Sequence, residues 1–82
     1  MVLVDIYVPS VNQTYDFQLM DSVPVGTVIE EIVEMVGQKE RCKIAGNAGD
    51  LQLADRQRGK LLEKDRTLYQ CGIHTGHSLI LV

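Results

Sequence analysis

The sequence contains few of the residues that mark specialised classes of protein. Its 82 residues include no tryptophan, one phenylalanine, two prolines and two cysteines. The core must therefore be aliphatic, and the two thiols are too few for a disulfide framework. No apolar run approaches the ~20 residues that cross a bilayer. The first residues, MVLVDIYV, lack the basic flank and cleavage site of a signal peptide. We expect a cytoplasmic protein that is peripheral to a membrane at most.

Positive charge is also scarce. Eight lysines and arginines face eleven aspartates and glutamates, which gives a formal net charge of −3. Proteins that bind nucleic acid usually carry a basic footprint, so we expect no nucleic-acid partner. A chain of this length predicts one domain over residues 1–82. Its core is thin, so we expect no large bound cofactor.

Two segments near the N-terminus alternate with a period of two, which is typical of half-buried strands. The apolar positions of the first segment are Val2, Val4, Ile6 and Val8. Those of the second segment are Tyr15, Phe17 and Leu19, alternating with Asp16, Gln18 and Met20. Turn residues lie between the two at positions 9–13. The sequence therefore predicts an antiparallel hairpin.

An apolar stripe at helical spacing follows the hairpin and predicts an amphipathic helix. The stripe residues are Val25, Val28, Ile29, Ile32, Val33 and Val36. All are β-branched, but packing against a sheet outweighs a penalty of about a few tenths of a kcal/mol per residue. Pro24 is expected in the first turn and Gly37 just beyond the last. Lys39, Arg41 and Lys43 are then expected to follow the C-terminal end of the helix, where positive charge is favourable.

Shorter elements are expected in the rest of the chain. Residues 46–50 predict a loop, 51–53 a strand, 55–59 a charged turn, 60–62 a strand and 68–71 a single helical turn. Residues 78–82 predict a final strand beside the first, with either Leu79 and Leu81 or Ile80 and Val82 facing the core. These elements indicate an α+β fold, with a mixed sheet of four to five strands packed on one main helix.

Several short motifs resemble known proteins. Arg66-Thr67-Leu68, Ile73 and the closing Leu79–Val82 resemble the C-terminal part of the ubiquitin-like β-grasp fold. A second set of motifs resembles the small YukD/EsaB-like proteins of bacterial type VII (WXG100) secretion systems. That set consists of Pro24-Val25 followed by Val28-Ile29, then Cys71-Gly72-Ile73 and Thr75-Gly76. The resemblance implies a ubiquitin-like β-grasp fold for the chain.

The resemblance also implies a function. Such proteins are small cytosolic accessory or regulatory parts of the secretion machinery, so it implies a non-enzymatic role through contacts with its protein components. One alternative is a ubiquitin-like modifier or sulfur carrier, which we disfavour because the sequence ends Leu-Ile-Leu-Val without a Gly-Gly tail. Another is a generic β-grasp interaction domain of a larger protein. Ubiquitin receptors are not expected to bind, because the charged residues 55–58 replace the apolar patch of ubiquitin.

Residues capable of chemistry are present, but their arrangement favours structural roles. Cys71, His74 and His77 could bind zinc, yet three ligands within seven residues lack a fourth. Cys42 or Cys71 could act as a nucleophile, yet no side chain is clearly placed to orient a histidine base. Residues 46–50 are glycine-rich but lack the lysine of a phosphate loop. We therefore expect no metal and no catalytic site.

Charged and apolar surface residues supply a candidate interaction surface. If the even positions of the first strand face the core, its odd positions face outward. The candidate residues are Leu3, Tyr7, Met20, Arg56, Arg58 and Lys60. The apolar members suggest a protein interface, a homodimer included, although scattered apolar surface residues are common. The basic members suggest contact with an acidic partner, or a charged turn that protects a strand edge. Glu30, Glu31 and Glu34 suggest either an acidic docking face or, more simply, a solvated helix face.

Overall fold

The predicted hairpin forms. The computed structural model describes residues 1–40 and 51–82. Strands β1 (Val2–Val8) and β2 (Gln13–Leu19) pair antiparallel, so β2 begins two residues earlier than Tyr15. The turn between them places Asn12 at a φ of 52°, a left-handed conformation that asparagine tolerates better than most residues. The even positions of β1 are buried and confirm the predicted alternation.

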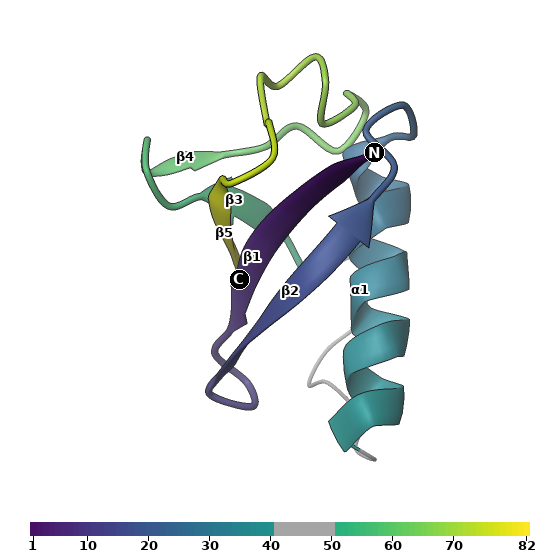
Figure 1. Cartoon of the computed structure of the whole chain (residues 1–82), viewed down its shortest axis with the longest axis vertical. Coiled ribbons are helices and arrows are strands. Elements are labelled where there is room, and N and C mark those ends of the chain that lie inside the picture. The colour runs from purple at the N-terminus through teal and green to yellow at the C-terminus, as the bar shows by residue number, and fades with distance from the viewer. Residues whose placement is uncertain (41–50) are drawn as a thin grey trace.

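Helix α1 (Val25–Glu40) covers one face of the sheet with its predicted stripe (Figure 1). Val33 is only half-buried, whereas the other five stripe residues are 0–1% exposed. The predicted ends were both wrong. Pro24 precedes the helix, and its carbonyl accepts the N–H groups of Thr27 and Val28. Gly37 lies inside the helix and Lys39 in its last turn, because one internal glycine costs only about 1 kcal/mol. Arg41 and Lys43 lie outside the described residues.

The sheet has five strands in the order β2-β1-β5-β3-β4. Strand β5 (Ser78–Leu81) runs parallel to β1, which confirms that the last strand pairs beside the first. All other pairs are antiparallel, so the sheet is mixed, as predicted. Leu79 and Leu81 are 0% and 3% exposed, which decides that these two residues face the core.

The short strands lie slightly away from their predicted places. Strand β3 is Leu53–Asp55, two residues later than predicted, and Gln52 and Val82 exchange a pair of backbone hydrogen bonds beside it. Strand β4 is Lys60–Leu61. Asp55 therefore ends a strand instead of starting a turn. Residues 68–71 form a hydrogen-bonded turn instead of a helix. The loop predicted at 46–50 and the Cys42 thiol lie outside the described residues.

The segment between β4 and β5 closes one end of the core. Leu62, Leu68 and Ile73 are buried from this segment. The carbonyl of Arg66 accepts the N–H of Val25 at 2.8 Å, which fixes the segment to the start of α1. The helix and this segment thus share one face of the sheet, and the opposite face carries the exposed positions of β1 and β2. Among the described residues, no helix combines the length and apolarity that a membrane span requires.

Candidate interaction surface

The face of the sheet opposite α1, which we call the outer face, carries a row of apolar side chains. Strand register aligns Tyr7 with Ile80, Ile80 with Ala54, and Ala54 with Leu61. The row therefore crosses four strands, from β1 to β4. Ile80 and Ala54 are half-buried, and Leu61 is 52% exposed. Sequence reasoning named only Tyr7, because the partners of a residue across a sheet depend on strand order.

Tyr7 and Arg56, named separately from the sequence, lie together at this row. The Arg56 guanidinium lies 5.7 Å from the centroid of the Tyr7 ring, within the range of a cation–π contact. The Tyr7 hydroxyl donates a hydrogen bond to the Asn12 side-chain oxygen at 2.8 Å. The Tyr7 side chain is thus held at its hydroxyl by a hydrogen bond and contacted at its ring by a cation.

Leu3 and Met20 lie toward the other end of the hairpin. Leu3 is 52% exposed and Met20 49% exposed, although Met20 falls just beyond the end of β2. Leu3 shares the outer face with Tyr7, because side chains four residues apart on a strand point the same way. The middle of β1 therefore lies between Leu3 and Met20 toward one end of the hairpin and Tyr7 toward the other.

An acidic pair occupies that middle. Asp5 on β1 lies directly opposite Asp16 on β2, and both side chains are exposed. A side-chain hydrogen bond with Asp5, together with its negative charge, raises the pKa of Asp16. Like charges directly opposite each other in a sheet are destabilising. The pair was missed from the sequence, although the hairpin turn implies it: a pairing of Val8 with Gln13 also pairs position 5 with position 16.

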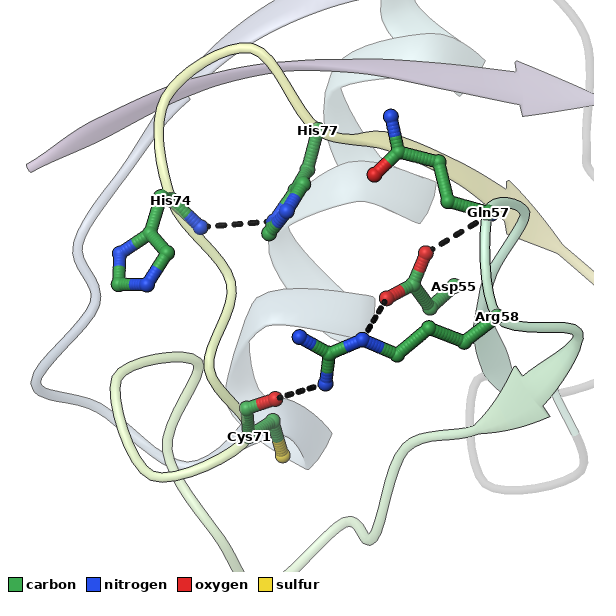
Figure 2. A network of polar contacts seen from close by, with 6 residues as sticks. All are labelled: Asp55, Gln57, Arg58, Cys71, His74 and His77. Carbon is green, nitrogen blue, oxygen red and sulfur yellow. Dashed lines mark hydrogen bonds and ion pairs between the residues drawn. The ribbon is translucent and has the colours of Figure 1, made fainter.

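The Arg58 side chain is 57% exposed, but its guanidinium lies between Asp55 and the carbonyl of Cys71 (Figure 2). Its Nε lies 3.5 Å from the Oδ2 of Asp55, and its Nη1 donates to the carbonyl of Cys71. Asp55 is 1% exposed, and its Oδ1 accepts the backbone N–H of Gln57 at 2.9 Å. A buried carboxylate is costly unless it is paired, so Arg58 and the Gln57 amide together stabilise this corner.

Lys60 lies apart from the contacts that Arg56 and Arg58 make. It lies on the edge strand β4, opposite Asp55, and is exposed. It borders a shallow hollow of about 390 Å³ that also touches Arg58, Arg66 and Glu63. Arg66 pairs with Glu63 at 2.7 Å, so the charges around the hollow largely compensate one another. A lysine on a short edge strand is a common protection against edge-to-edge pairing.

The histidines belong to a turn that fastens β5 to β1. The backbone N–H of His74 donates to Nδ1 of His77 at 2.8 Å (Figure 2). Gly76 donates to the carbonyl of Leu3, and Asp5 donates to the carbonyl of His77. Within residues 1–40 and 51–82, no three potential ligands among histidine, cysteine, aspartate and glutamate gather in a metal-binding group. The imidazole acceptor of His77 is engaged in the turn itself.

The glutamates of α1 lie away from the outer face. Glu30, Glu31 and Glu34 are all exposed, and no ion pair forms to them from the described residues. They form the solvated face of a helix whose other side is buried.

Solved structures share this architecture. The N-terminal ubiquitin-like domain of the 4931431F19Rik protein has a TM-score of 0.72 and 25% identity, over 99% of this chain and 72% of that one. The Caldiarchaeum subterraneum ubiquitin has a TM-score of 0.72 and 17% identity, over 98% of this chain and 89% of that one. A de novo design based on ubiquitin has a TM-score of 0.74 and 18% identity, over 99% and 85%. These likenesses establish the ubiquitin-like β-grasp fold.

Comparison of sequences identifies a specific family within this fold. None of the curated proteins matches the chain. A family model described as the WXG100 protein secretion system protein YukD matches residues 2–81. That match spans every strand and the helix, from the start of β1 to the end of β5. The chain therefore belongs to the YukD family, the ubiquitin-like proteins of the WXG100 protein secretion system.

Proposed function

We propose that this protein serves WXG100 secretion as a non-enzymatic accessory component, acting in the cytoplasm through contacts with other protein components. The observation that carries the proposal is the apolar character of the outer face. The solvated side of an antiparallel sheet normally alternates to polar residues. Here Leu3, Tyr7, Ile80 and Leu61 lie on it.

The surface has the composition of a protein interface. Tyrosine, methionine and arginine are enriched in interfaces, and apolar anchors surrounded by polar residues are typical of them. We propose that Leu3, Tyr7, Met20 and Leu61 supply the apolar contact and that Arg56 contributes at its rim. Arg58 acts indirectly by holding the 55–59 turn. Lys60 lies at the sheet edge, where it would limit unwanted strand pairing.

A complementation experiment tests this proposal. A strain lacking the gene is expected to export less of its WXG100 substrates, and the wild-type gene is expected to restore export. Leu3→Ser and Leu61→Ser, singly and together, are expected to restore it poorly because they remove exposed apolar contacts. Met35→Ser is the matched control, because Met35 is 41% exposed on α1, away from the outer face.

Two results would contradict the proposal. Normal export without the gene would show that secretion does not need the protein. Full restoration by the Leu3→Ser/Leu61→Ser variant would show that the outer face is not its working surface. Protein levels measured by immunoblot, and thermal unfolding of the purified variants, separate loss of contact from loss of folding.

A further inference from the structure

The acidic pair lies inside the apolar outer face, where any partner that covers the apolar residues must also cover the carboxylates. Asp5 stands between Leu3 and Tyr7 on the same side of β1. Alternate residues of a strand are about 7 Å apart, so one bound segment would meet all three side chains. Asp16 widens the acidic site onto β2.

The charge of this pair is uncompensated within the described residues. Around the pair lie Gln18 and Thr14 on β2 and Ser78 on β5, none of which carries a charge. Arg56 donates its backbone N–H to the carbonyl of Ser78, but it directs its guanidinium over the Tyr7 ring. No ion pair forms to either carboxylate from the described part of the chain. The acidic pair therefore holds two like charges together without a counter-ion from any described side chain.

We propose that the outer face binds a segment of a partner protein that places a lysine or arginine between Asp5 and Asp16 and apolar side chains against Leu3 and Tyr7. This inference rests on the proposed function and adds the chemistry of the partner. A cation at the pair relieves the like-charge repulsion, and a guanidinium can contact both carboxylates at once. The apolar flanks supply the area that an exposed ion pair alone lacks.

Charge complementarity also selects this partner over a second copy of the chain. The protein has a formal net charge of −3, and a copy seated face to face would bring its own acidic pair to the contact. Like-charge juxtaposition across an interface is unfavourable and suppresses wrong partners. A basic segment meets the same surface with opposite charge.

The test uses short overlapping peptides tiled across the intracellular parts of the WXG100 secretion components of the producing strain. Binding to the purified full chain is measured by fluorescence anisotropy at low and high salt. We expect the binding peptides to contain a lysine or arginine between apolar residues, and we expect affinity to fall with salt. The Asp5→Asn/Asp16→Asn variant is expected to bind them about tenfold more weakly. Glu30→Gln/Glu31→Gln makes the same change in net charge on α1 and is expected to bind normally.

Four results would overturn the inference: no peptide binds, the bound peptides lack a cation, the two double variants weaken binding equally, or sedimentation shows a dimer that Leu3→Ser dissociates. Both double variants retain the apolar core, and thermal unfolding checks that they fold. Complementation separates this inference from the proposed function. If the deletion strain fails to export and Asp5→Asn/Asp16→Asn restores export fully, the acidic pair is dispensable while the accessory role stands.

Discussion

The guanidinium of Arg58 lies 3.5 Å from the carboxylate of Asp55, which is the only buried charged side chain among the described residues. Asp55 closes strand β3, and Arg58 reaches back to it from the turn that follows. The same guanidinium donates to the carbonyl of Cys71, so the pair also connects this turn to the segment before β5. One guanidinium thus connects three parts of the chain, through an ion pair and a hydrogen bond.

Arg58→Ala is expected to lower the free energy of unfolding by about 1–3 kcal/mol. The substitution leaves the buried Asp55 carboxylate with the Gln57 amide as its remaining partner, and an unpaired buried charge is destabilising. Urea denaturation followed by circular dichroism measures the change. Lys60→Ala removes an exposed cation that forms no ion pair with any described residue, and we expect it to change stability by less than about 0.5 kcal/mol. Equal effects of the two substitutions would contradict the role given to Arg58.

Periodicity explains which parts of this structure were predictable. The even positions of β1 and the stripe of α1 are buried as the sequence indicates, because one-sided burial imposes a period of 2 or 3.6. The end of α1 was not predictable from Gly37, since tertiary packing easily overrides the weak preference of one glycine. Asp55 resembled a turn residue because its neighbours are polar, and only the fold shows that Arg58 reaches back to it.

The candidate surface was partly predictable for a similar reason. The outward direction of Leu3 and Tyr7 follows from alternation along one strand. The alignment of Tyr7 with Ile80 and Ala54 requires the strand order, which places the C-terminal strand in the middle of the sheet. The pairing of the last strand with the first was predicted, but the register of that pair and the place of β3 beside β5 leave no local signal in the sequence. The pairing of Asp5 with Asp16 lies between these two cases in predictability, because it requires only the register of the hairpin.

Asp16→Asn is expected to stabilise the protein at neutral pH. The hydrogen bond with Asp5 and the charge of Asp5 raise the pKa of Asp16, so the fold favours its protonated form. That stabilising contribution is present below the ordinary pKa of the carboxyl and is lost as pH rises through the raised value. The asparagine side chain cannot ionise, so the variant avoids the destabilisation that the ionised Asp16 brings beside Asp5. Its melting temperature should therefore exceed that of the wild type at pH 7 and approach it in acid. Asp21→Asn, on an aspartate outside the pair, should show no such gain. A gain that persists unchanged at low pH would contradict the assignment.

His77→Ala is expected to loosen the turn before β5. The Nδ1 of His77 accepts the backbone N–H of His74, and losing this acceptor should cost about 0.5–1.5 kcal/mol. Hydrogen exchange monitored by NMR should show faster exchange at the His74 amide and at the Gly76 amide, which bonds to Leu3. His74→Ala is the matched control, because His74 contributes its backbone N–H and would keep the bond. If both variants exchange alike, the imidazole acceptor is not what orders the turn.

Gly76→Ala is expected to destabilise the protein by about 1–3 kcal/mol. Gly76 has a φ of 96°, which a residue with a Cβ rarely adopts, and its N–H donates to the carbonyl of Leu3 at 2.8 Å. No atom lies within 4 Å of an added Cβ, so the effect would come from backbone strain and not from a clash. Gly59→Asn tests this distinction. Gly59 also has open space around it, but its φ of 64° lies in the left-handed region that asparagine tolerates. Thermal unfolding should therefore show a clear loss for Gly76→Ala and a small one for Gly59→Asn, and the reverse order would show that backbone strain at position 76 is not what requires glycine there.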